Sequence, residues 1–277
     1  MEYGDKHILV LGAGASGIGA SWVLAQVGAH VVLNDYKPMT LPTAEEKRLV
    51  ATGVNIITGR QDESLLDGVD RIVISPGISL DIPIVKAAHA RGIDVVSEVE
   101  LAYEVSKSPI VAVTGTNGKT TTTTLLTKVL EGSGKPVRVG GNIGDSLSEV
   151  AYAMPADGFL VAELSSYQLE TIKHFRPVGA IMLNITPDHL ARHKTMENYI
   201  AAKERIFENQ LSTDYLVLNI DDPVVADMEH RAPSHILKIS QKKAVENGAY
   251  YADGKCYIAK DGVAKFVIGN EDIHIPG

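Results

Sequence analysis

The segment richest in residues that can do chemistry is Thr114–Thr121, which reads TGTNGKTT. Glycines in such a segment let the backbone bend closely around an anion, with its N–H groups pointing inward. A helical pattern begins directly afterwards, so the positive end of the helix dipole and the ammonium group of Lys119 serve the same place. The general P-loop pattern has a glycine where this chain has Val113, so the segment is a shortened variant. We interpret it as a phosphate-binding loop rather than a plain strand-to-helix turn.

Two polar residues stand just past apolar runs that predict strands, where open α/β sheets place their ligands. Glu163 follows the run 159–162, and a carboxylate there is well placed to hold Mg²⁺ on nucleotide phosphates. The alternative is a surface acid in a loop. His189 follows the run 178–184, but a lone histidine is more often structural than a ligand. By itself, this histidine decides nothing.

Lys203 interrupts an apolar helical stripe. Tyr199, Ile200, Ile206 and Phe207 flank it at helical spacing, so all of these side chains share one helix face. Burial there lowers the pKa of a lysine and leaves a nucleophilic neutral amine. Such an amine can react with carbon dioxide to give a carbamate, which is an anion and a metal ligand. From periodicity alone, however, a lysine that snorkels from the edge of the stripe to solvent ranks first.

A second Gly-rich turn, Gly12–Gly17, lies near the start of the chain and fits the G-x-G-x-x-G pattern. An apolar run precedes it, a helical pattern follows it, and Asp35 stands 18 residues after Gly17. This context favours a nucleotide-binding Rossmann turn whose acid contacts the nucleoside. The alternative is close helix–strand packing with no ligand. The loop 75–79 and the turn Gly140–Gly144 also follow strands, and for the latter a plain turn is equally favoured.

The elements that must position these residues alternate along the chain. Apolar runs predict strands at 7–11, 30–34, 54–57, 71–74, 94–96, 111–113, 137–139, 159–162, 178–184 and 215–219, then short alternating strands at 235–239, 249–251, 256–259 and 263–268. Asp253–Lys255 and Asp261–Gly262 are typical hairpin turns between the last of these. The final residues, 273–277, show no closing helix, and the chain is expected to be cut there.

Two predictions concern helices. After the phosphate loop, the helical stripe formed by Leu125, Leu126, Val129 and Leu130 is expected to pack on the sheet. Ser97 is expected to cap the helix that runs to about residue 105, in a capping box with Glu100.

The predicted fold class is α/β. A Rossmann-like N-terminal domain, 1–107, is followed by a P-loop ATPase-type α/β domain, 108–277, which ends in a small antiparallel β addition. The boundary is placed at Lys107–Pro109, where a fresh strand starts toward the phosphate loop.

Composition excludes several classes of function. The net charge of -8 argues against nonspecific binding to nucleic acid or to an anionic membrane. No apolar stretch approaches the roughly 18 residues of a membrane span, and the N-terminus lacks the basic head of a secretion signal. Cys256 is the one cysteine of the sequence, so no disulfide forms within it. We therefore expect a cytoplasmic protein that binds no nucleic acid and inserts into no membrane.

Five motifs together resemble the Mur ligase family, the ATP-dependent amide ligases that build the peptide of bacterial peptidoglycan. They are TGTNGKT at 114–120, GGNIG at 140–144, ELSSYQLE at 163–170, NITPDH at 184–189 and AAKER at 201–205. The ELSSYQL segment and Asn117 resemble the family member that adds D-glutamate. The resemblance implies three domains, for UDP-substrate, ATP and amino acid, of which the third is expected to be absent here.

This resemblance implies an acid–amino-acid ligase that joins D-glutamate to UDP-N-acetylmuramoyl-L-alanine through an acyl phosphate. The two-domain piece is expected to be inactive alone and monomeric. A sibling ligase that adds another amino acid is the nearest alternative. A nicotinamide-dependent oxidoreductase would use Gly12–Asp35 but leaves the phosphate loop, Glu163 and Lys203 unexplained. A non-enzymatic nucleotide switch would use the phosphate loop alone.

The resemblance also implies a set of site residues. ATP would be bound by Gly115, Thr116, Asn117, Gly118, Lys119, Thr120 and Thr121. The UDP-substrate would be bound by Gly14, Ala15, Ser16, Gly17, Asp35, Ser75, Gly77, Asn142 and Ser165. Two Mg²⁺ sites would be formed, one by Thr120 and Glu163 and one by His189 and a carbamate on Lys203. Lys119, His189 and Lys203 would be the catalytic residues.

Overall fold

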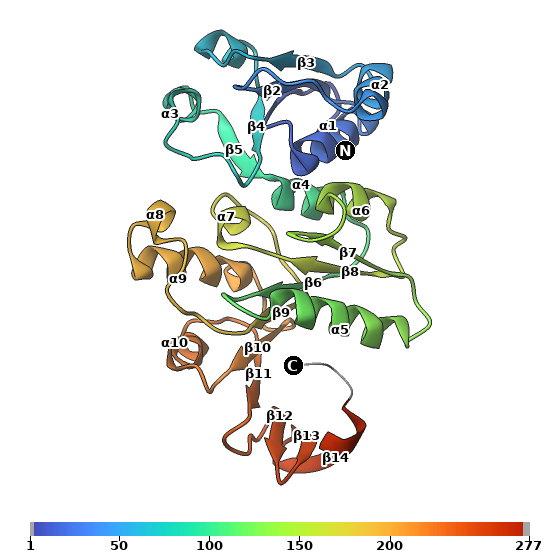
Figure 1. The fold of residues 1–277 in the computed structure, drawn as a ribbon, viewed down its shortest axis with the longest axis vertical. Coiled ribbons are helices and arrows are strands. Elements are labelled where there is room, and N and C mark those ends of the chain that lie inside the picture. Colours follow the sequence, from blue (N-terminus) through green and yellow to red (C-terminus); the bar gives the residue numbers. More distant parts are fainter. Residues whose placement is uncertain (1–2, 274–277) are drawn as a thin grey trace. The chain divides into compact units, whose positions relative to one another are not determined.

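The structure is a computed structural model that describes residues 3–273 (Figure 1). By its internal contacts the chain divides into two compact units. The first comprises residues 1–110 and 123–175, and the second comprises residues 111–122 and 176–277. The predicted division at residue 107 into two domains stays a prediction. The end of the chain that we expected to be cut, 274–277, lies outside the described residues.

The first unit contains a parallel sheet with the strand order β3-β2-β1-β4-β5 (Figure 1). Its strands are β1 His7–Leu11, β2 His30–Asp35, β3 Asn55–Thr58, β4 Arg71–Ile74 and β5 Asp94–Ser97. Its helices are α1 Ala15–Gln26, α2 Thr43–Ala51, α3 Pro83–Ala90 and α4 Glu98–Val105, with a short 3-10 helix at Glu63–Leu66. The order and the parallel register are those of the predicted Rossmann-like domain.

Both faces of this sheet are buried, which is why its strands read as continuous apolar runs. Ile8 and Val10 of β1 join a cluster with α1, whereas Leu9 and Leu11 join a second cluster with α3 on the opposite face. The alternation along a single strand therefore connects two hydrophobic cores and fixes the register of the sheet.

The first unit also contains β7 Val137–Gly141 and β8 Phe159–Glu163, which pair in parallel. Helix α6 Leu147–Ala153 lies between them in the chain, and α7 Ser166–Leu169 follows β8. Helix α5, Lys119–Glu131, begins in the second unit and continues into the first. These elements carry Asn142 and Glu163, two of the predicted site residues.

The second unit is built on strands in the order β14-β13-β12-β11-β10-β9-β6. The strands are β6 Ile110–Thr114, β9 Gly179–Met182, β10 Tyr215–Asn219, β11 His235–Ser240, β12 Gly248–Ala252, β13 Lys255–Lys260 and β14 Val263–Gly269. The helices of this unit are α8 Leu190–His193, α9 Met196–Glu204 and α10 Pro223–Asp227, with 3-10 turns at Arg205–Phe207, Met228–His230 and Asn270–Asp272. From β6 to β12 the pairing is parallel.

The last three strands form the predicted antiparallel addition (Figure 1). Asp253 and Gly254 have φ values of 49° and 76°, and Asp261 and Gly262 have 51° and 77°. Two successive residues with positive φ define the tight hairpin turn that matches the twist of its strands. Both predicted hairpins are therefore confirmed.

Two predictions about helices are wrong. On α5, Leu125 is 48% exposed and Val129 is 65% exposed, while Thr123 is fully buried. Leu126 and Leu130 are half-buried, so the stripe is only partly covered, and the residue of α5 that packs most deeply is Thr123. Ser97 makes no capping hydrogen bond, and the carboxylate of Glu100 instead accepts the backbone N–H groups of residues 173–175.

Within residues 3–273, the helices are all too short or too polar to cross a membrane.

Candidate functional site

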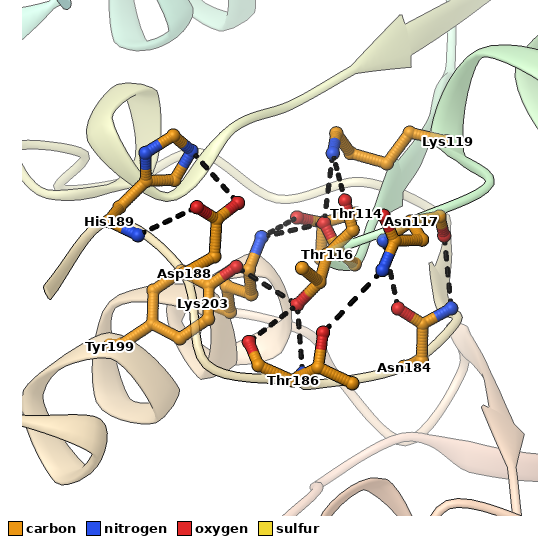
Figure 2. Close-up of polar contacts among 11 residues, drawn as sticks. Thr114, Thr116, Asn117, Lys119, Asn184, Thr186, Asp188, His189, Tyr199 and Lys203 are labelled. Carbon is orange, nitrogen blue, oxygen red and sulfur yellow. Dashed lines mark hydrogen bonds and ion pairs between the residues drawn. The ribbon is translucent and has the colours of Figure 1, made fainter.

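The phosphate loop is braced from the neighbouring strand by one asparagine. The loop leaves β6 at Thr114 and enters α5 at Lys119. Asn184, just past β9, accepts the N–H of Thr116 on its carbonyl at 2.9 Å and the N–H of Asn117 on its side chain at 2.8 Å (Figure 2). Its own amide donates back to the carbonyl of Asn117 at 3.0 Å. The sequence marked Asn184 only as the first residue of the NITPDH motif and gave it no role at the site, although an asparagine at a strand end is a typical loop brace.

Thr116 ties the loop to a second segment and to a helix. Its hydroxyl accepts the N–H of Thr186 at 3.0 Å and lies 3.0 Å from the hydroxyl of Tyr199 (Figure 2). Tyr199 is 1% exposed and belongs to α9, the helix that carries Lys203. The loop is therefore fixed against α9, which brings the predicted ATP-binding residues to Lys203.

The ammonium group of Lys119 is turned onto its own loop. It donates to the carbonyls of Gly115 at 3.1 Å and Thr116 at 2.8 Å (Figure 2). A phosphate bound in the loop would offer this lysine a charged acceptor in place of two carbonyls, and hydrogen bonds between charged groups are roughly twice as strong as neutral ones.

Lys203 is buried, and the snorkelling interpretation is wrong. The residue is 2% exposed, and its amine donates to the carbonyl of Gly115 at 2.8 Å and to the Thr114 hydroxyl at 3.4 Å (Figure 2). The amine also lies 5.0 Å from the ring centroid of Tyr199. Burial, and to a smaller extent the positive charge of Lys119, lowers the pKa of Lys203 to about 7, while Asp188 acts in the opposite direction. The neutral amine is therefore accessible near neutral pH.

His189 also lies near Tyr199. Its backbone is left-handed, with φ 54° and ψ 22°, a conformation that a non-glycine residue rarely adopts outside functional or tightly determined sites. Its ring nitrogen Nε2 lies 3.3 Å from the Asp188 carboxylate, and 45% of its side chain is exposed. The rings of His189 and Tyr199 are 6.4 Å apart. The structure thus places an exposed histidine and a buried amine around one tyrosine.

Oxygen donors suitable for Mg²⁺ occur in both units. Thr120 lies on the first turn of α5. Glu163, at the end of β8, is 1% exposed; its Oε1 accepts the amide of Asn142 at 2.9 Å, while its buried Oε2 has no hydrogen-bond partner. Residues 3–273 hold no group of three or more His, Cys, Asp or Glu residues that could bind a metal. Mg²⁺ commonly uses one or two protein carboxylates together with water and phosphate, so the orphaned Oε2 fits such an ion.

The N-terminal glycine turn needs glycine for packing at one position. A Cβ on Gly17 would lie 1.8 Å from the carbonyl oxygen of Gly12, whereas a Cβ on Gly14 would meet nothing within 4 Å. Gly14 is the N-cap of α1, and its side chain position is open. The turn therefore packs helix on strand and still leaves the helix N-terminus accessible to an anion.

Asp35 braces this turn. Its carboxylate accepts the N–H of Ala13 at 3.0 Å and the N–H of Lys37 at 2.9 Å. Beside it lies a cavity of about 610 Å³, lined by Asp35, Tyr36, Lys37, Gln61, Gly77, Ile78, Ser79, Ile82, Pro83 and Ile84. Two predicted site residues, Asp35 and Gly77, thus share one cavity. The structure adds Gln61, whose amide donates to the Asn34 side chain at 2.9 Å; nothing in its sequence context indicated it.

The remaining predicted substrate residues are held in loops of the first unit. Ser75 donates to the Gly12 carbonyl at 3.2 Å, which ties the 75–79 loop to the glycine turn. Ser165 is the N-cap of α7 and forms a capping box with Gln168. Asn142 contacts Glu163 as described. Their roles in binding a substrate stay predictions.

The fold and the site define a class of protein. The family model described as "Mur ligase middle domain" matches residues 113–276, more than half of the chain, and the "Mur ligase MurD-like, N-terminal domain" model matches residues 6–97. The chain therefore belongs to the Mur ligase family.

Named relatives extend this assignment. The chain is 46% identical to the UDP-N-acetylmuramoylalanine–D-glutamate ligase of Thermoanaerobacter sp. (strain X514) and 47% identical to that of Caldanaerobacter subterraneus subsp. tengcongensis. In both comparisons the alignment covers all of this chain and 61% of the relative. Among solved structures, the UDP-N-acetylmuramate:L-alanyl-gamma-D-glutamyl-meso-diaminopimelate ligase from Neisseria meningitides has the same fold, with a TM-score of 0.61 at 23% identity over 94% of this chain and 86% of that one.

Proposed function

We propose that this chain supplies the UDP-substrate-binding and ATP-binding parts of a ligase that adds D-glutamate to UDP-N-acetylmuramoyl-L-alanine. The names of relatives at 46% and 47% identity support the choice of amino acid. In the proposed reaction, ATP transfers its γ-phosphoryl group to the L-alanine carboxylate, and the D-glutamate amine then displaces phosphate to form the amide. Bound Mg²⁺ would offset the negative charge that gathers between the two anions.

The observation that carries the proposal is the buried amine of Lys203 beside the phosphate loop. A neutral amine can attack carbon dioxide: a nitrogen–carbon bond forms, a proton leaves the nitrogen, and the lysine becomes a carbamate anion. The pKa near 7 makes the required neutral form available. The modified side chain would present oxygen, which Mg²⁺ prefers, next to Thr114 and Gly115. A simple nucleotide switch has no use for such a group.

The loop residues would divide the work of holding ATP. Backbone N–H groups of 115–121 and the start of α5 would face the phosphates. Lys119 would exchange its two carbonyl partners for the β- and γ-phosphate oxygens. We further propose Thr120 and Glu163 as ligands of one Mg²⁺, and His189 with the Lys203 carbamate as ligands of a second.

In the first unit, the cavity beside Asp35 is proposed to receive the nucleoside of the UDP-substrate. The accessible N-terminus of α1, at Gly14–Gly17, is proposed to face its diphosphate. The loop 75–79 supports this placement, because its Ser75 is hydrogen-bonded to the glycine turn and its Gly77 lines the cavity.

The test uses calorimetry on the 277-residue chain. UDP-N-acetylmuramoyl-L-alanine is expected to bind, whereas NAD⁺, the ligand of the oxidoreductase alternative, is not. Asp35→Ala should weaken binding about tenfold, because the glycine turn loses the carboxylate that accepts the Ala13 N–H and the cavity loses a wall residue. Equal affinity for both nucleotides would contradict the proposal. In the complete ligase, phosphate release that responds to another amino acid better than to D-glutamate would favour a sibling activity.

A further inference from the structure

Glu98 is a buried carboxylate that the proposed reaction does not use. It is the first residue of α4 and is 2% exposed. One oxygen, Oε1, accepts the Ser146 hydroxyl, the Ser148 N–H at 2.9 Å and the Ser148 hydroxyl at 2.9 Å. The other oxygen, Oε2, is buried without a hydrogen-bond partner. Burying a carboxylate with one oxygen unpaired costs free energy. Its contacts are therefore expected to have a role in positioning neighbouring residues.

The three donors belong to the segment that follows Asn142. Ser146 is the N-cap residue of α6, and Ser148 lies on its first turn. At its other end the loop is held by Glu163, whose carbonyl accepts the N–H of Asn142 at 2.8 Å and whose Oε1 accepts the Asn142 amide at 2.9 Å. The loop 142–148 is therefore hydrogen-bonded to Glu163 at its start and to Glu98 at its end.

The loop is also seated against the first helix of the chain. A Cβ on Gly19 of α1 would lie 2.2 Å from the Ser146 hydroxyl oxygen, so Ser146 fits only because residue 19 is glycine. Helix α1 begins at the Gly14–Gly17 turn. Ser146 thus joins three parts of one unit: the helix behind the glycine turn, the helix that carries Glu98, and the loop that carries Asn142.

We propose that Glu98 is a positioning residue for the Asn142–Glu163 pair. It touches no reacting atom and acts through Ser146 and Ser148, which set where the loop ends and hence where Asn142 presents its amide to Glu163. Because Ser146 also packs against α1, the same contacts fix Asn142 relative to the turn Gly14–Gly17. Asn142 and this turn are the two predicted diphosphate contacts. The inference rests on the proposed function, from which Asn142 and Glu163 take their roles.

The hydrogen bonds, rather than the negative charge, are the part of Glu98 that this role requires. Burial raises the pKa of Glu98, whereas the hydrogen bonds from Ser146 and Ser148 lower it and the nearby Glu149 raises it. A neutral acceptor of the same shape, glutamine, can take the same three donors. Alanine cannot: the two serine hydroxyls, 2.9 Å apart, could still pair with each other, but the buried Ser148 N–H and one hydroxyl hydrogen would lose their acceptor.

The experiment compares E98A, E98Q and the wild-type chain, with E104Q as a matched control. Glu104 is on the same helix and is also largely buried, but it pairs with Arg71 and Tyr3. Amide hydrogen exchange of Asn142 is the first readout, and the Kd for UDP-N-acetylmuramoyl-L-alanine is the second. E98A should exchange Asn142 about tenfold faster and bind about tenfold more weakly, E98Q should stay within about twofold of wild type, and E104Q should change neither.

If E98A fails to fold, S148A replaces it, because this change removes one donor to the carboxylate and leaves Glu98 in place. Unchanged Asn142 exchange in E98A or S148A, or equal acceleration in E104Q, would overturn the proposal. The exchange measurement needs no ligand, so it tests the positioning role even if the wild-type chain fails to bind the UDP-substrate, an outcome that would count against the proposed function alone.

Discussion

Replacing Lys203 by methionine should change how the stability of the protein depends on pH. The native pKa of Lys203 is about 7, against 10.5 for an ordinary lysine. Between these values the unfolded chain binds a proton that the native protein does not, so stability rises with pH. The slope for one proton is about 1.4 kcal/mol per pH unit. Below pH 7 both states are protonated and the full penalty of burying the charge is present.

From pH 7.5 to 9 the wild-type chain should therefore gain about 2 kcal/mol in free energy of unfolding relative to K203M. Methionine matches the length of lysine and does not titrate, so the difference between the two proteins isolates this group. The measurement is urea denaturation followed by circular dichroism, in buffers freed of carbon dioxide. Lys128→Met is the control, because the side chain of Lys128 is 69% exposed and pairs with Glu131 on the surface.

A difference between wild type and K203M that stays flat over this range would refute the reasoning, because a buried, unmodified lysine must show the slope. Adding bicarbonate at pH 8 extends the test. We expect it to stabilise the wild type, since carbamate formation removes neutral amine, and to leave K203M unaffected. ¹³C-labelled bicarbonate should give a carbamate resonance in the wild type alone.

Three further predictions concern single side chains. Asn184→Ala removes both side-chain contacts that hold Asn117, so affinity for a fluorescent ATP analogue should fall about tenfold, and an unchanged affinity would mean that the backbone contacts suffice. Gly17→Ala should destabilise the chain by about 1–3 kcal/mol in thermal unfolding, whereas Gly14→Ala, which meets nothing within 4 Å, should not; equal losses would contradict the packing role. Val129→Thr, at a position that is 65% exposed, should alter stability by less than about 0.5 kcal/mol, and a larger loss would show that the α5 stripe is covered.

The sequence predicted the features that depend on local pattern. Strand runs, the two Asp–Gly hairpins and the strand–turn–helix around Thr114–Lys119 each follow from neighbouring residues, and the structure has each in place. That the turn binds phosphate stays a prediction. The capping box does not form because the Glu100 carboxylate instead accepts hydrogen bonds from three backbone N–H groups at residues 173–175. Those donors lie more than 70 residues away in the chain, where no local pattern reaches.

The burial of the Lys203 side chain could not be predicted from the sequence for a related reason. Periodicity places the residue on a helix face, but whether that face is buried depends on the carbonyl of Gly115 and the ring of Tyr199. The bracing role of Asn184 was not predicted, although the residue belongs to the NITPDH motif, and Gln61 was not singled out, because single amides in loops follow no spacing rule. The prediction that the α5 stripe packs on the sheet was wrong because an apolar helix face indicates burial but does not identify the surface that covers it.

The inward turn of Lys119 is expected to limit which anions can bind in the loop. Its ammonium is already satisfied by two carbonyl oxygens of the loop, so an incoming anion must compete with an internal ligand. If a monovalent ion such as chloride binds, Lys119 gains one contact to the ion and loses its two hydrogen bonds to loop carbonyls. A polyphosphate offers several oxygens. Some of them can accept hydrogen bonds from the backbone N–H groups while Lys119 still donates to its two carbonyls. We therefore expect the loop to prefer polyvalent anions to monovalent ones such as chloride.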